Sequence, residues 1–125
     1  MIFDTDVLIW ALRGSHRAAK AIEECESRKI STISYMELIQ GARNGKELQG
    51  IRSFLVELGF EIHSLSENIG HRAMVYMEEF CLSQNLAIAD ALIAATAVEK
   101  QTTLCTGNAK HFRFLAELDL KSFRP

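Results

Sequence analysis

Apolar and polar positions change along the chain in blocks that predict strands separated by helices. Short apolar or β-branched runs at 1–3, 30–33, 60–65 and 102–106 predict four strands. Between them, helical spacing of apolar residues predicts helices over 7–12, from Ser15 to about Arg28, and over 34–43, 46–58, 66–84 and 86–98. Connections of this length join parallel strands, so the pattern predicts an open α/β sheet with helices on both faces.

One acidic residue interrupts the most apolar of these helices. Asp90 is the only charged residue between positions 86 and 98. A carboxylate in such surroundings is usually neutral, paired with a cation, bound to a metal or open to a cleft. Two more acids interrupt apolar segments, since Asp4 directly follows the first run and Glu37 lies in the helix predicted over 34–43. Three acids in such positions suggest one metal site.

Each acid also has a local explanation that the sequence leaves open. Asp4 is a suitable N-cap for the helix that follows it. Ser34 and Glu37 have the spacing of a capping box, in which each side chain satisfies a backbone donor of the other residue. Asp90 fits the first turn of a helix, where the helix dipole favours a negative charge.

Taken together, the three acids favour a cation. Carboxylates about 4 to 5 Å apart repel by on the order of 4 kcal/mol at an effective dielectric constant near 20. Without a cation, the pKa of at least one would rise until it took up a proton. Mg²⁺ prefers a few carboxylates together with retained water, so the acids suit it.

Composition limits the classes of protein to consider. The chain has 125 residues, 48% hydrophobic and 24% charged, which predicts a single globular domain over 1–125. The three cysteines form no Cys-x-x-Cys pair, the N-terminus does not resemble a signal peptide, and no apolar run could span a bilayer. We therefore expect a cytoplasmic protein with reduced thiols and no membrane contact. Because the net charge is −2, any affinity for the phosphates of a nucleic acid must be local. The candidate positive residues for such binding are Arg13, Arg43, Lys110 and Arg113.

Four segments together resemble a known family. FDTDVLI with Asp4, SYMELIQGA with Glu37, ADALIAATA with Asp90 and LCTGNAKHF at 104–112 resemble, in order, the motifs of PIN-domain ribonucleases, and more narrowly VapC-type toxins of bacterial toxin–antitoxin pairs. The resemblance covers essentially the whole chain. It implies a three-layer α/β/α domain with a mostly parallel central sheet of four or five strands.

The resemblance also implies a site and a function. Asp4, Glu37 and Asp90 would be the catalytic residues and would hold one or two Mg²⁺ or Mn²⁺ ions. Thr106 would orient the first aspartate, Asn108 would lie beside the cluster, and we expect Asp6 to give support rather than direct ligation. The protein would be an endoribonuclease toxin leaving 5′-phosphate and 3′-hydroxyl ends. It would form a homodimer, bind a VapB-like antitoxin and join a higher toxin–antitoxin complex.

One residue departs from the family pattern. The last motif usually has Asp or Glu before Phe, whereas His111 precedes Phe112 here. Imidazole is a poor ligand for Mg²⁺ and a better one for Mn²⁺, which puts a second metal position in doubt. His111 could instead hydrogen-bond a metal-bound water, contact the scissile phosphate or protonate the leaving oxygen.

Two alternatives belong to other classes. The segment FDTDVL matches the first motif of haloacid-dehalogenase-type phosphatases, with Asp4 as nucleophile and Asp6 as acid and base. That mechanism needs a Lys and further acids on later strands, and only 17 residues follow Asn108. The other alternative is a PIN-like module that binds a partner and whose catalytic set is weakened by His111.

Overall fold

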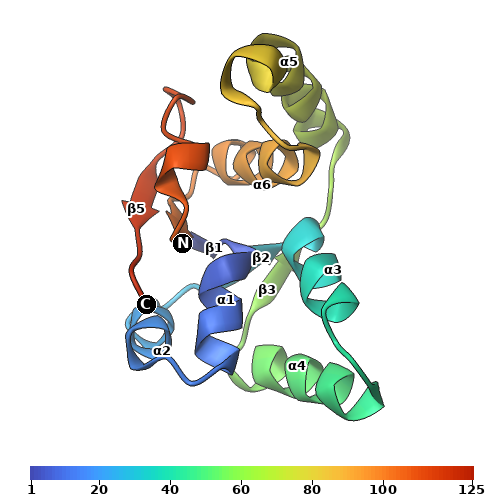
Figure 1. Cartoon of the computed structure of the whole chain (residues 1–125), viewed down its shortest axis with the longest axis vertical. Coiled ribbons are helices and arrows are strands. Elements are labelled where there is room, and N and C mark those ends of the chain that lie inside the picture. Colours follow the sequence, from blue (N-terminus) through green and yellow to red (C-terminus); the bar gives the residue numbers. More distant parts are fainter.

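The sheet of the computed structural model, which describes residues 1–125, contains five parallel strands in the order β3-β2-β1-β4-β5 (Figure 1). The strands are β1 (Ile2–Phe3), β2 (Lys29–Ser31), β3 (Glu61–His63), β4 (Leu104–Thr106) and β5 (Leu120–Ser122). The helices are α1 (Thr5–Leu12), α2 (His16–Glu23), α3 (Thr32–Gln40), α4 (Gly45–Glu57), α5 (Glu67–Gln84), α6 (Ile88–Glu99) and the short 3₁₀ helix η1 (Ala109–His111).

Two apolar clusters lie on opposite faces of this sheet, because successive residues of a strand point to opposite faces. Ile2 and Leu104 pack with residues of α5 and α6, whereas Phe3 and Cys105 pack with residues of α1, α2 and α4. Figure 1 shows α5 and α6 on one side of the strands and α1, α2 and α4 on the other. The predicted three-layer α/β/α fold with a parallel sheet is therefore confirmed. No helix combines the length and apolarity that a membrane crossing requires.

The carboxyl ends of the two central strands meet at one edge of the sheet. Phe3 pairs with Cys105, and the Asp4 N–H donates to the Cys105 carbonyl oxygen at 2.9 Å. Asp4 therefore leaves β1 beside Thr106, the last residue of β4. In parallel sheets this edge is where sites usually form.

The second helix is shorter than predicted. It begins after its N-cap Ser15 as expected but ends at Glu23, before Arg28. The Arg28 side chain donates from Nε to the Ile22 carbonyl at 2.8 Å and from Nη1 to the Leu58 carbonyl at 2.8 Å. Arg28 thus satisfies a carbonyl at the end of α2 and links it to the end of α4, so the helix need not continue.

Other boundaries also differ from the prediction. β2 ends at Ser31 and α3 begins at Thr32, although a strand was predicted over 30–33 and a helix from Ser34. The Ser31 side chain is the N-cap, since its hydroxyl accepts from the Ser34 N–H at 3.0 Å. The fifth strand, β5, pairs in parallel with β4 at the sheet edge, and the hydrophobic pattern did not predict its position.

Candidate metal centre

Asp4 is the most buried acid of the candidate site. Only 6% of its surface is exposed. One carboxylate oxygen accepts from the Thr5 N–H at 2.8 Å, which makes Asp4 the N-cap of α1, and the other accepts from the Thr106 hydroxyl at 2.8 Å. Burial, together with the charge of Asp6, raises the pKa of Asp4 to about 7, against the lowering effect of these hydrogen bonds. Asp4 is therefore the N-cap of α1 and also a carboxyl group at the sheet edge whose burial disfavours its ionised form.

Asp6 lies in the first turn of α1 and faces the loop after β4. Its Oδ2 accepts from the Gly107 N–H at 2.9 Å and from the Asn108 side-chain amide at 3.2 Å. Its Oδ1 is buried and has no hydrogen-bond partner. Burial raises the pKa of Asp6, while the backbone hydrogen bonds and the nearby His111 lower it.

Glu37 is held by a chain of buried hydroxyl groups. Thr5 Oγ1 lies 2.6 Å from Glu37 Oε1 and 3.0 Å from Ser34 Oγ, which in turn lies 3.3 Å from Ser31 Oγ. Since a hydroxyl has one proton, Thr5 donates to the carboxylate and leaves the Ser34 hydroxyl to donate to Thr5. The capping box expected from Ser34 and Glu37 is wrong, because Ser34 is already inside α3.

Sequence reasoning missed this hydroxyl chain. Thr5, Ser31 and Ser34 are all buried polar residues. A hydroxyl residue next to Asp4 and two others one helical turn apart were the available signals. Their pairing across the sheet edge depends on α1 lying against α3, which a sequence pattern does not reveal.

Asp90 lies in the first turn of α6, as its local explanation requires, at a helix start that lacks a side-chain cap. The positive end of the helix dipole therefore acts on its carboxylate. His111 Nδ1 is 3.6 Å from Asp90 Oδ2. Burial raises the pKa of Asp90, His111 lowers it, and the negative charges of Glu37 and Asp6 raise it. The pKa of Asp90 thus depends on His111 of η1, Glu37 of α3 and Asp6 of α1.

These side chains have the chemistry of a site for a hard divalent cation. The four acids, Asp4, Asp6, Glu37 and Asp90, offer only carboxylate oxygens, and burial, followed by the charges of neighbouring acids, raises the pKa values of Asp4 and Asp90. One buried oxygen, Asp6 Oδ1, has no partner. No three acidic, histidine or cysteine side chains are positioned to hold an ion as they stand. The residues fit Mg²⁺ or Mn²⁺, and binding would require their side chains to converge.

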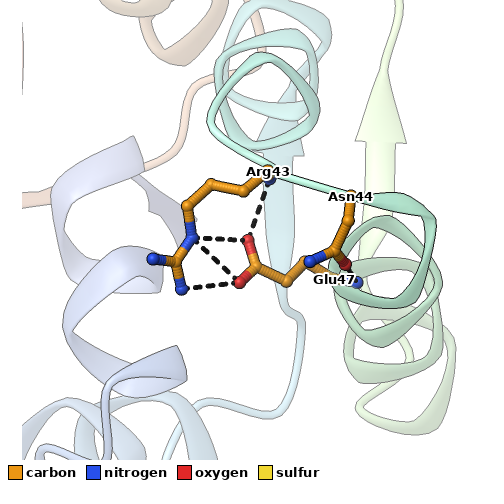
Figure 2. A network of polar contacts seen from close by, with 3 residues as sticks. All are labelled: Arg43, Asn44 and Glu47. Carbon is orange, nitrogen blue, oxygen red and sulfur yellow. Dashed lines mark hydrogen bonds and ion pairs between the residues drawn. The ribbon is translucent and has the colours of Figure 1, made fainter.

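A hollow of about 740 Å³ lies beside Glu37 and is lined by residues of α1, α3 and α4. Arg13 and Arg43, two of the predicted RNA-binding residues, lie on its wall. The Arg43 guanidinium is paired with Glu47, with Nη2 2.8 Å from Oε2 (Figure 2). Arg13 forms no ion pair or side-chain hydrogen bond, so it is the freer cation of the two.

The other two predicted RNA-binding residues flank His111. Lys110 lies in η1 and Arg113 follows it, and both are exposed. Neither side chain forms a hydrogen bond or an ion pair. The structure brings the acids, Thr106, Asn108 and His111 together, whereas it leaves the contribution of Lys110 and Arg113 to RNA binding a prediction.

Comparisons with known proteins agree with this arrangement. Residues 1–118 match the PIN domain family. The chain is 33% identical over 124 residues to Ribonuclease VapC10 of Mycobacterium tuberculosis, which covers 94% of this chain and 90% of that protein. It is also 33% identical over 124 residues to Ribonuclease VapC1 of Methanocaldococcus jannaschii, covering 98% and 86%. A toxin–antitoxin complex from Klebsiella pneumoniae contains a chain that superimposes with a TM-score of 0.80, at 31% identity over 94% of this chain and 93% of that one. This chain therefore belongs to the PIN-domain family, alongside VapC relatives.

Proposed function

We propose that this protein is a metal-dependent endoribonuclease that acts as the toxin of a toxin–antitoxin pair. One observation carries the proposal: four acids from three helices and a strand end collect at one sheet edge, where burial and the charges of neighbouring acids raise the pKa values of Asp4 and Asp90. A cation bound between these acids would relieve the repulsion between their carboxylates. The ribonuclease names of relatives at 33% identity support RNA as the substrate.

Asp4, Glu37 and Asp90 would hold the ion. When bound, Mg²⁺ or Mn²⁺ supplies a Lewis acid that lowers the pKa of water and offsets charge developing on the phosphodiester. Thr106 and the α1 N-terminus fix the orientation of Asp4, and the Thr5 hydroxyl fixes that of Glu37. His111, next to Asp90, is exposed and can give a proton to the leaving 3′ oxygen.

An antitoxin is the proposed protein partner. The Klebsiella pneumoniae chain, at 31% identity, was solved in a toxin–antitoxin complex. A VapB-like antitoxin for this chain, a homodimer, a higher toxin–antitoxin complex and a cytoplasmic location all stay predictions that rest on the resemblance.

The geometry disfavours the phosphatase alternative. Its nucleophile would be Asp4, and the mechanism also needs a lysine beside the two aspartates. No lysine forms an ion pair with Asp4 or Asp6. The partner-binding alternative has the same fold and the same acids and differs from the enzyme only in lacking RNA cleavage. A cleavage assay distinguishes the two.

The test is cleavage of a mixed cellular RNA pool by purified protein in Mg²⁺, Mn²⁺ or EDTA. Asp90→Asn is run in parallel, with Asp119→Asn as the matched control because Asp119 is exposed and lies outside the site. We expect metal-dependent cleavage by the wild type and the control and none by Asp90→Asn. Equal inactivity of all three proteins with intact metal binding would favour the partner-binding module.

A further inference from the structure

Asp6 has a buried oxygen that no protein group satisfies. Oδ2 accepts from the Gly107 N–H and the Asn108 amide, whereas the backbone N–H groups of Asp6 and Val7 act on the carboxylate without forming a hydrogen bond to Oδ1. A buried carboxylate oxygen without a donor is costly, so native proteins rarely retain one. Besides Asp6 Oδ1, the only buried side-chain polar atoms without a partner are His63 Nε2 and Arg72 Nε, and both are nitrogens.

The loop after β4 is shaped around Asp6. A Cβ atom at Gly107 would lie 2.5 Å from Asp6 Oδ2, so a side chain at this position would displace the carboxylate. The close approach lets the Gly107 N–H reach Oδ2. The contact holds the Asp6 carboxylate in place from the side opposite to α1.

The hydrogen bonds of Asp6 do not explain its charge. Both donors reach a single oxygen, and the carbonyl oxygen of an asparagine could accept from them equally well. An acid retained where an amide would satisfy the same donors indicates a further partner for its second oxygen, Oδ1.

No cationic side chain fills that role within bonding distance of Asp6. His111 lowers the pKa of Asp6 but forms no ion pair with it, and its Nδ1 lies 3.6 Å from Asp90 Oδ2 instead. His111 also stands where the family pattern has an acid, so the last motif contributes no carboxylate. A cation shared with Asp4 and Asp90 would satisfy Oδ1.

We propose that Asp6 is a direct metal ligand of this chain through Oδ1 and supplies the carboxylate that position 111 lacks. The inference rests on the proposed function, because it adds a ligand to the same metal centre. It replaces the supporting role expected for Asp6 and leaves the metal with a carboxylate from α1 in place of one from η1.

Mn²⁺ binding measured by calorimetry tests the inference without reference to activity. Asp6→Asn keeps the acceptor for Gly107 and Asn108 and removes only the charge. We expect its Mn²⁺ affinity to fall by about tenfold or more, as loss of metal-shell groups usually causes. The double variant Asp6→Asn/His111→Asp should recover most of the affinity, because it returns an acid to the last motif.

The outcomes separate this inference from the proposed function. If the wild type binds Mn²⁺ and Asp4→Asn abolishes binding while Asp6→Asn binds like the wild type, Asp6 is no ligand but the metal centre stands. If the wild type itself binds no Mn²⁺, both proposals fail. Asp6→Ser serves as a second variant, and unfolding in EDTA verifies that each variant is folded. Loss of affinity in both folded variants, with recovery in the double variant, supports direct ligation.

Discussion

The buried carboxyl group of Asp4 should make the metal-free protein less stable as the pH rises. Its pKa is 3.8 in the unfolded chain and about 7 in the folded protein. Because the folded state holds the proton more tightly, this contribution is fully present below about pH 4 and is lost as the pH rises through about 7. A tenfold change in proton affinity is worth about 1.4 kcal/mol, so the full effect is about 4 kcal/mol.

Asp4→Asn should remove most of this loss. The new amide can still accept from the Thr5 N–H and can donate to Thr106 Oγ1. Weaker, uncharged hydrogen bonds cost about 1 to 2 kcal/mol. The variant should therefore be more stable than the wild type by roughly 2 to 3 kcal/mol at about pH 8 and less stable by roughly 1 kcal/mol near pH 4.

Urea denaturation in EDTA between about pH 5 and about pH 8 measures the difference. The partly buried His63 has the opposite effect on stability, because burial lowers its pKa, but wild type and variant share this effect. Asp119→Asn, at an exposed position, is the control and should follow the wild type. A stability difference between Asp4→Asn and wild type that does not change with pH would refute the reasoning.

Substitutions at three further positions test other contacts of the fold. Thr5→Val removes the hydroxyl that donates to Glu37, so the affinity for Mn²⁺ should fall by about tenfold. Thr5→Ser keeps a hydroxyl and should bind Mn²⁺ like the wild type. Equal affinity of the two variants would contradict the positioning role of Thr5. Gly107→Ala should destabilise the protein by about 1 to 3 kcal/mol in urea denaturation, because its Cβ would crowd Asp6. Asn85→Ala should lower stability by about 1 kcal/mol in thermal unfolding and Asn85→Gly should not, since this residue caps α5 with a φ of 55°.

The central strands and the longer helices were predictable because their hydrophobic signal is strong. The ends of α5 and α6 fall within two residues of the prediction. β5 was not placed, because only Leu120 of its three residues is even half-buried. An edge strand with two exposed residues has no alternating pattern to detect.

The acids of the site were predictable from the sequence, whereas the hydrogen-bond donors that hold them were less so. Asp4, Glu37 and Asp90 were identifiable as charges in apolar segments, and the hydrogen bond between Thr106 and Asp4 agrees with the resemblance. The donors that hold Glu37 were not identifiable, because Thr5 is 32 residues away from it in sequence. Such contacts arise from helix packing, so only the folded chain reveals them.

The pairing of β1 between β2 and β4 also constrains the order of events during synthesis. Asp4 is among the first residues made, yet the hydroxyl that orients it belongs to Thr106, 102 residues later in the chain. β1 has one of its two neighbours only after residues 104 to 106 leave the ribosome. A nascent chain therefore cannot orient Asp4 through Thr106 until translation of this domain is nearly finished.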